Sequence, residues 1–253
     1  MFNPLDDPLL VLAFSLPTLW IAGWIGGSIR NRQGKLDEDI HADFVFFLSG
    51  TLTLLGLIVG FTFSMAVSRY DQRKGYEEQE ANAIGTEYVR ADLLPTADAV
   101  KVRSLLSSYL DQRILLYRSR EERQLRQINA QTARLQAEMW STVATVATAQ
   151  PTPVASLIVA GMNDVLNSQG YSQAARRNRI PISAWTLLIM LSIFCNLMLG
   201  YSAHRRDAFL FLVLPIALSL SLFLIADIDS PARGVIRVQP ENLESVVESL
   251  HSQ

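Results

Sequence analysis

Hydrophobic positions along this chain gather into four long blocks instead of being spread evenly. Each block holds about 20 residues without Lys, Arg, Asp or Glu, which is the length needed to cross a hydrocarbon core of about 30 Å. The blocks are residues 9–29, 44–67, 184–203 and 208–226. The pattern predicts four membrane-spanning helices, the first kinked near Pro17.

The order of the blocks predicts an all-α integral membrane protein with two transmembrane hairpins. Short segments, 30–43 and 204–207, join the members of each pair, and a long polar segment separates the pairs. An even number of crossings places both termini and that segment on one side of the membrane. The predicted domains are a first hairpin (1–67), a helical extramembrane domain (68–183), a second hairpin (184–228) and a C-terminal tail (229–253).

Within the extramembrane domain, apolar residues recur at helical spacing. The pattern predicts helices at about 99–120, 125–146 and 154–167, with breaks at Pro95 and at the Gln-Pro-Thr-Pro sequence that begins at Gln150. Asp98 is a candidate cap for the first of them. An intramolecular bundle explains the short repeat better than a freestanding coiled coil does. The only segment with an extended pattern is 234–238.

Composition narrows the class of protein. The chain has 253 residues, 49% of them hydrophobic, with mean hydropathy +0.20 and net charge −2. No basic tract indicates nucleic acid as a partner. No nucleophile elbow, phosphate loop or Cys/His metal spacing occurs, so we expect neither an enzyme nor a bound cofactor or metal. The single cysteine, Cys195, excludes an internal disulfide framework.

Charged residues near the span ends indicate on which side of the membrane the extramembrane domain lies. The residues before the first block include two Asp and no Lys or Arg, which is not the pattern of a cleaved signal peptide. More Lys and Arg flank the span ends on the side of the extramembrane domain than on the other side. We therefore expect a multi-pass protein of the bacterial inner membrane with that domain in the cytoplasm.

The second block carries a continuous face of small and hydroxylated residues. Its members recur at steps of four, three, four, four and four: Ser49, Thr53, Gly56, Gly60, Ser64 and Ser68. One interpretation is close helix packing, because the Gly-x-x-x-Gly pair lets helix backbones approach in lipid. The other is a pore wall, because hydroxyl groups offer water and ions partners that aliphatic side chains lack. Both can hold along one helix.

A second stripe lies beside the first. Leu57, Phe61 and Met65 recur at steps of four near the end of the block. Side chains of this size can close a pore by dewetting, so they are candidates for an apolar neck. Ordinary contact with lipid is the alternative.

Beyond the membrane the second block continues as a charged helix. Pairs four residues apart, Arg73 with Glu77 and Lys74 with Glu78, support a helix that leaves the bilayer without a break. Several copies around an axis would arrange its charges into rings of a soluble vestibule. The candidate vestibule residues are Arg69, Asp71, Arg73, Glu77, Glu80 and Glu87.

After the fourth block, Asp227, Asp229 and Arg233 surround a proline. One interpretation is a turn that ends the helix, with charges that pair with one another at the membrane surface. The other is a latch that docks the tail on the extramembrane domain.

Several longer phrases of the sequence resemble a known family. They are "LLGLIVGFTFSMAVSRYDQRKGYEEQEANAIGTEYVRADLLP", "QPTPVASLIVAGMNDVLN", "RIPISAW" and "ADIDSPARGVIRV". In this order, from about residue 48 to the C-terminus, they are similar to the bacterial membrane family described as bestrophin-like. That family is named for its similarity to bestrophins, homopentameric ion channels with four membrane helices per subunit and a helical cytosolic domain between the second and third.

The resemblance implies a homo-oligomeric, pentameric channel for inorganic ions, with the second span lining the pore. The match carries no selectivity residue over to a position here, so the neck assignment rests on analogy of position and chemistry. A single four-span subunit is too small to enclose a lined pore, so the pore requires several copies. The alternative function is a non-conducting membrane scaffold or sensor that acts through its helical domain.

Overall fold

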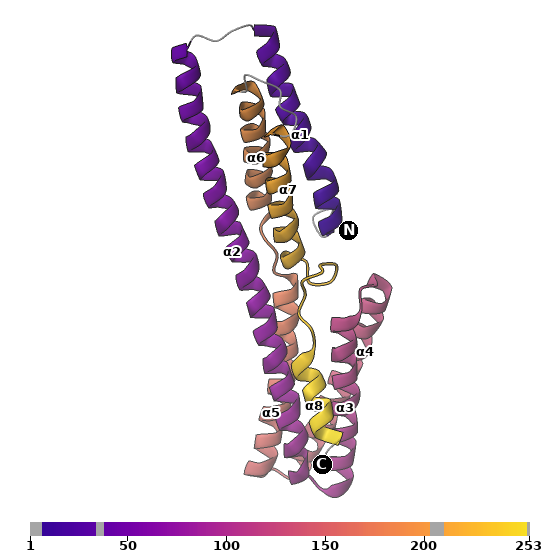
Figure 1. Cartoon of the computed structure of the whole chain (residues 1–253). Coiled ribbons are helices and arrows are strands. Elements are labelled where there is room, and N and C mark those ends of the chain that lie inside the picture. Colours follow the sequence, from indigo (N-terminus) through magenta and orange to yellow (C-terminus); the bar gives the residue numbers. More distant parts are fainter. Residues whose placement is uncertain (1–6, 34–37, 203–209, 252–253) are drawn as a thin grey trace. The chain divides into compact units, whose positions relative to one another are not determined.

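The computed structural model describes residues 7–33, 38–202 and 210–251, and this part of the chain is helical with no strand. In chain order (Figure 1), its elements are α1 (Pro8–Gln33), α2 (Glu38–Arg90), the 3-10 turn η2 (Ala91–Leu93), α3 (Thr96–Arg118), α4 (Glu122–Ala149), α5 (Pro153–Arg177), α6 (Ile182–Ser202), α7 (Leu210–Asp229) and α8 (Glu241–His251). The predicted all-helical class is confirmed. Part of the first predicted hairpin connection (34–37) and all of the second (204–207) lie outside the described residues.

Four helical segments in the described part are long and apolar enough to cross a membrane: Pro8–Arg32, Ala42–Leu93, Pro153–Ser202 and Phe211–Asp229. Each overlaps one of the four predicted blocks, and the second and third extend well beyond theirs. Pro17 lies inside α1 without ending it, and α2 continues for 53 residues with no break after its apolar part. The prediction of a helix that extends beyond the apolar block is therefore confirmed.

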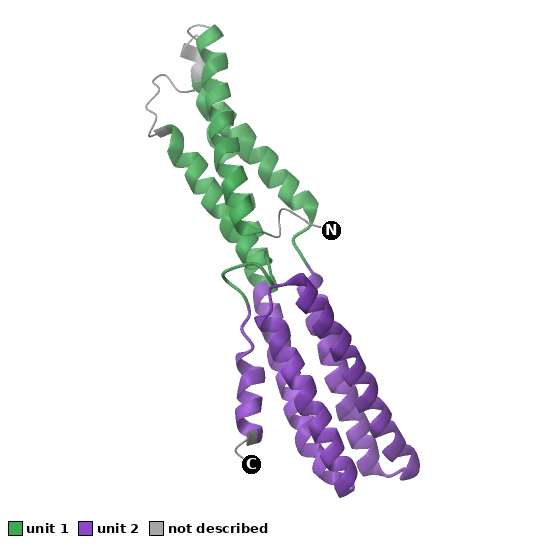
Figure 2. Cartoon of the chain, turned by 90° about the vertical axis from the view of Figure 1, so that its right-hand side faces the viewer, with its two compact units in different colours: residues 1–69, 179–237 green, residues 70–178, 238–253 purple. Residues whose placement is uncertain are grey.

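The chain divides into two compact units, drawn in different colours in Figure 2. Unit 1 consists of residues 1–69 and 179–237, and unit 2 of residues 70–178 and 238–253. Helix α2 contributes to both. The last residues of the chain thus form part of unit 2 instead of a separate tail.

In unit 1, α1 packs closely on α6 through glycines. A Cβ atom added at Gly200 would overlap the backbone of Gly23, and one added at Gly26 would overlap the carbonyl group of Leu197. Such backbone-to-backbone contact is possible only without side chains, as at other small-residue interfaces in membranes. The close helix contact therefore forms at α1 and α6, and not at the Gly-x-x-x-Gly pair of α2.

Helix α2 joins unit 1 through its other face. Leu55 is buried in a cluster with Leu19 of α1, Cys195 of α6 and Leu218 of α7. The same face continues in both directions: Leu48 lies seven residues before Leu55, Thr62 lies seven after it and Ala66 four after Thr62, and all three are buried. Because this face of α2 is buried in unit 1, the opposite side of the helix stays uncovered.

Unit 2 is a helical bundle with one hydrophobic core. Its core residues come from the end of α2 and from α3, α4, α5 and α8; Ile84, Leu106, Met139, Met162 and Leu243 are fully buried. The buried residues of α4 follow the predicted stripe, because Ile128, Thr132, Leu135, Met139 and Val143 all lie inside.

Three local predictions differ from the structure. Helix α5 runs to Arg177, ten residues past its expected end, and Asp98 lies inside α3, whose N-cap residue is Pro95 without a side-chain cap. A Thr152 hydroxyl instead caps α5, accepting from the N–H of Ala155 at 3.1 Å. Residues 234–238 form bends and coil, because their N–H groups bind a carboxylate and not a neighbouring strand, as described below.

Candidate functional site

The small face of α2 has no covering in the described protein. All six of its residues, Ser49, Thr53, Gly56, Gly60, Ser64 and Ser68, are exposed. A Cβ atom added at Gly56 or Gly60 would meet no described atom within 4 Å. Close packing of the two glycines thus has no partner within the described protomer, and the face is free to meet water, lipid or another copy.

Two of the hydroxyl groups on this face are hydrogen-bonded within the helix. Ser49 Oγ donates to the carbonyl oxygen of Val45 at 2.8 Å, and Thr53 Oγ1 donates to that of Ser49 at 2.9 Å. Each hydroxyl keeps its lone pairs as acceptors. The face therefore presents uncharged oxygen acceptors separated by glycines.

The predicted neck residues form an uncovered apolar stripe beside it. Leu57, Phe61 and Met65 are 53%, 65% and 39% exposed, so α2 does not bury them against its own subunit. Arg69 lies one turn beyond Met65 and its Nη2 contacts the Met65 sulfur at 3.6 Å. A guanidinium group thus sits at the end of the apolar stripe.

The candidate vestibule charges separate into two groups. Asp71 is exposed and Arg69 is half-buried. The other four, Arg73, Glu77, Glu80 and Glu87, are buried in the protomer, with at most 4% exposure. The expectation that these four face an aqueous vestibule is corrected, because they fall on the face of α2 that turns into the core of unit 2.

Glu80 forms a buried ion pair with Arg113 of α3. Glu80 Oε1 accepts from Arg113 Nε at 2.5 Å and Oε2 accepts from Nη2 at 3.2 Å, and neither side chain is exposed. Tyr109 OH donates to Glu80 Oε1 at 3.3 Å, and Arg113 Nη2 reaches Ser172 of α5 at 3.4 Å. Burial alone lowers the pKa of Arg113, but the charge of Glu80 raises that pKa above its usual value. The network ties α2, α3 and α5 together.

Glu77 holds the start of α8. Its Oε1 accepts from the N–H of Leu243 at 3.0 Å, and its Oε2 accepts from Asn242 Nδ2 at 2.7 Å. A carboxylate at a helix N-terminus satisfies free N–H groups and interacts favourably with the helix dipole. Burial nevertheless raises the pKa of Glu77, an effect that these hydrogen bonds oppose. The end of the chain is thereby fixed to unit 2.

Glu87 is a buried carboxyl group without a hydrogen bond. Neither of its oxygens has a partner among the described residues, and its nearest cation, Arg90, lies 3.8 Å away. A Cβ atom added at Gly161 of α5 would overlap Glu87 Oε2, so this glycine makes room for the carboxyl. Burial raises the pKa of Glu87 to about 8; Arg90 opposes the shift and Asp164 of α5 adds to it.

The Glu87→Gln substitution is expected to reduce the pH dependence of stability. Because the folded-state pKa exceeds the ordinary value, the neutral form stabilises the fold fully below about pH 4.5 and this contribution is lost as pH rises to about 8. Between pH 6 and pH 8 the parent loses roughly 2 kcal/mol from this group, and the neutral amide loses none. Thermal melting of the detergent-purified protein at both pH values measures the difference.

Glu78→Gln is the matched control for that measurement, because Glu78 is exposed on the same helix. We expect this variant to keep the parent's pH dependence. Equal loss of stability between pH 6 and pH 8 in the parent and in Glu87→Gln would contradict the assigned role of Glu87.

Two carboxylates in the last turn of α7, Asp227 and Asp229, bind backbone groups of neighbouring segments in unit 1. Asp227 accepts from the N–H groups of Val235 at 2.7 Å and Ile236 at 2.8 Å. Asp229 accepts from the N–H of Ile180, just before α6, and its backbone carbonyl accepts from Arg179. Arg233 is exposed, and its N–H donates to Ser230 Oγ at 3.4 Å. Both carboxylates thus accept from backbone N–H groups, Asp229 also lies 3.9 Å from Arg179 Nε, and the latch stays a prediction.

A protein-family model describes the chain from residue 11 to residue 243 as a bestrophin-like domain. The chain belongs to the bestrophin-like family. The match begins in the first span, whereas the phrases that suggest the family in the sequence begin at about residue 48. The predicted resemblance is thus confirmed over a longer stretch than expected.

Solved structures share the fold of this bestrophin-like chain. Two are crystal structures of a bacterial bestrophin homologue from Klebsiella pneumoniae, each with one substitution. The first has a TM-score of 0.67 at 12% identity, covering 97% of this chain and 98% of the other. The second has a TM-score of 0.68 at 13% identity, covering 95% and 98%. A third, described as a membrane protein, has a TM-score of 0.68 at 13% identity and covers 97% of each chain.

A search of curated proteins found no match. At 12 to 13% identity the similarity to solved structures concerns the fold. The arguments about individual residues of this bestrophin-like chain therefore rest on its own contacts.

Sequence reasoning missed several residues that shape these sites. Arg113 and Asn242 bind acidic residues of α2, and Gly161 leaves space for another. Each of the three is distant in the sequence from the residue that it contacts. Helix α8 had a usable signal, since Leu243, Val246 and Leu250 recur at steps of three and four. That periodicity predicts an amphipathic helix.

Proposed function

We propose that the protein is a homo-oligomeric ion channel, a pentamer in the bacterial inner membrane, in which the second span lines the pore. The observation that carries this proposal is the uncovered state of α2. In its most apolar stretch 11% of the residues are buried, against 44% in α7. A span with so little of its surface covered by its own subunit must contact lipid, water or other copies of the subunit.

The chemistry of the bare face favours water over lipid. Glycine and hydroxylated residues bury little apolar surface against acyl chains, whereas their oxygens can act as acceptors for water or a hydrated ion. Several α2 helices around an axis would line a neutral, hydrophilic wall with Ser49, Thr53 and Ser64, widened at Gly56 and Gly60. One subunit cannot enclose such a wall, so the proposal requires several copies.

The adjacent stripe provides a gate in the same assembly. Leu57, Phe61 and Met65 lie about 100° around the helix from the small face, so a rotation of α2 by about this angle exchanges the small face for the apolar stripe at the axis. A ring of such side chains closes a narrow pore by excluding water.

The proposed topology places unit 2 in the cytoplasm, following the excess of Lys and Arg at the span ends on its side. Four spans in two hairpins with unit 2 between them agree with the order of the elements. The wall itself carries no charge, so selection between cations and anions depends on charged groups at its ends, where Arg69 is half-buried and Asp71 is exposed in the protomer. The fold of bacterial bestrophin homologues supports the assignment.

Replacing Phe61 with alanine is expected to raise the basal conductance. The substitution removes the most exposed side chain of the proposed neck, 65% exposed in the protomer, and so lowers the barrier to wetting. If the substitution lowers the barrier to wetting of the pore by about 1.4 kcal/mol, the current rises about tenfold. Planar-bilayer recording of purified protein at symmetrical salt measures this change.

Phe194→Ala is the matched control, because Phe194 lies on α6, outside the proposed pore wall and neck, and is 49% exposed. We expect the control to conduct like the parent. Before recording, light scattering must show that all three proteins form the same oligomer. Unchanged currents in Phe61→Ala would remove the neck from the proposal, and a monomeric parent would favour the scaffold function instead.

A further inference from the structure

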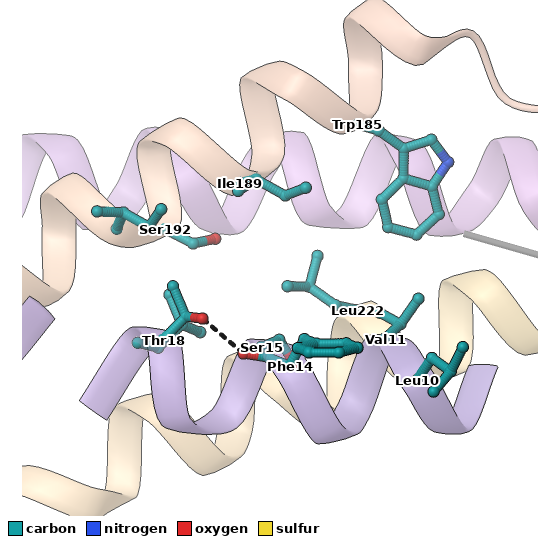
Figure 3. A pocket seen from close by; sticks show the side chains of 11 residues that line it. Leu10, Val11, Phe14, Ser15, Thr18, Trp185, Ile189, Ser192 and Leu222 are labelled. Atoms are coloured by element: carbon teal, nitrogen blue, oxygen red, sulfur yellow. Dashed lines mark hydrogen bonds between the residues drawn. The ribbon is translucent and has the colours of Figure 1, made fainter. Parts of the chain in front are cut away.

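Unit 1 contains an apolar cavity of about 180 Å³ between α1, α6 and α7. Figure 3 shows the side chains that surround it: Val11 and Phe14 come from α1, Trp185 and Ile189 from α6, and Leu222 from α7. Val11 and Trp185 are each the fourth residue of their helices. The cavity therefore begins near the ends of two predicted spans and extends along them.

The lining offers little to water. The hydroxyls of Ser15 and Thr18 donate to the carbonyl oxygens of Leu12 and Phe14 in their own helix. Ser192 Oγ is buried and has no partner among the described residues, so it offers one free hydroxyl group to the cavity. A buried water needs two to four polar partners, and cavities without them stay dry or take apolar ligands.

The cavity is large enough and accessible enough for a hydrocarbon. An apolar protein cavity of about 150 Å³ holds a benzene-sized molecule. At the rim, Phe14 is 67% exposed and Ile189 is 39% exposed, so the cavity can be entered from the surface of unit 1. The surrounding helices are those that qualify as membrane spans, and the apolar molecules present at such a surface are lipid chains.

We propose that this cavity binds the acyl chain of a membrane phospholipid. Several methylene groups enter past Phe14 and Ile189 and gain van der Waals contacts by filling space that would otherwise be empty. The bound chain joins α1 to α6 and α7 near their ends. This site is independent of ion conduction.

Tryptophan quenching tests the site, because Trp185 lines the cavity and is only 3% exposed. In full-length protein with Trp20, Trp24 and Trp140 replaced by Phe, Trp185 is the sole fluorophore. We expect bilayers of 9,10-dibromostearoyl phosphatidylcholine to quench it at least twofold more strongly than they quench the same protein carrying Val11→Phe, which fills the cavity. Leu9→Phe is the control, since Leu9 is 68% exposed on α1 and outside the cavity.

Equal quenching in the Val11→Phe and Leu9→Phe proteins would overturn the proposal. So would an absence of quenching in both, because the cavity would then be filled by another copy or inaccessible to lipid. Native mass spectrometry of the parent provides a second readout that needs no substitution in the cavity. At least one retained phospholipid per subunit is expected after detergent exchange, and complete loss of lipid contradicts the site.

Discussion

Replacing Glu80 with alanine is expected to lower the free energy of unfolding by about 3–5 kcal/mol, the usual cost of breaking a buried ion pair. The substitution leaves the guanidinium of Arg113 charged, unexposed and without its carboxylate. One of its nitrogens, Nη1, already has no partner among the described residues. Thermal melting of the detergent-purified protein should show a midpoint lower by roughly 10 °C.

A double substitution separates the charge from the packing. Glu80→Leu with Arg113→Met removes both charges while keeping apolar volume, and we expect it to recover most of the lost stability. Glu78→Ala is the control on the exposed side of the same helix and should change stability by less than about 0.5 kcal/mol. If Glu80→Ala melts like the Glu78→Ala control, the pair does not stabilise unit 2.

The second large effect is expected at the contact between α1 and α6. Gly200→Ala adds a methyl group that overlaps the backbone of Gly23. Backbone atoms of two packed helices cannot move aside as a flexible side chain can, so the helices must separate. We expect a loss of about 3 kcal/mol or more, above the usual cost of overpacking a core, measured as a lower melting midpoint.

Gly56→Ala provides the comparison on α2, because a methyl group there meets no described atom within 4 Å. We expect its melting midpoint within the oligomer to change far less than that of Gly200→Ala. The same substitution narrows the proposed pore and should lower the current. Similar destabilisation by both substitutions would indicate that Gly56 packs against another copy as closely as Gly200 packs against α1.

The spans and their continuation were predictable because each follows from a local pattern. About 20 apolar residues without a charge indicate a span whatever surrounds it. Oppositely charged residues four apart after Arg69 predict that α2 continues, and α2 does so as far as Arg90. The periodicity of α4 likewise predicts its buried face, from Ile128 to Val143.

The roles of the charged residues were not predictable, because they depend on partners far away in the sequence. Glu77, Glu80 and Glu87 recur at helical spacing and looked like a solvated face. Their burial depends on Arg113, Asn242 and the space left by Gly161. A sequence pattern gives the spacing of such charges but not the side of the helix that the bundle covers.

The glycines also show that a sequence pattern does not determine which residues make contact. The Gly56–Gly60 pair matches a packing motif, yet the close contact forms at Gly23, Gly26 and Gly200, whose spacing within the sequence gives no indication of their pairing. The motif identifies residues that permit close approach, and only the arrangement of the helices determines which of them are used.

The most direct test of the channel assignment is planar-bilayer recording from the purified oligomer under an asymmetric salt gradient. The account predicts discrete currents with a defined reversal potential, whose sign identifies the permeant ion as a cation or an anion. Silence from an oligomer of verified size, in bilayers where a known channel conducts, would contradict the account and support a non-conducting scaffold.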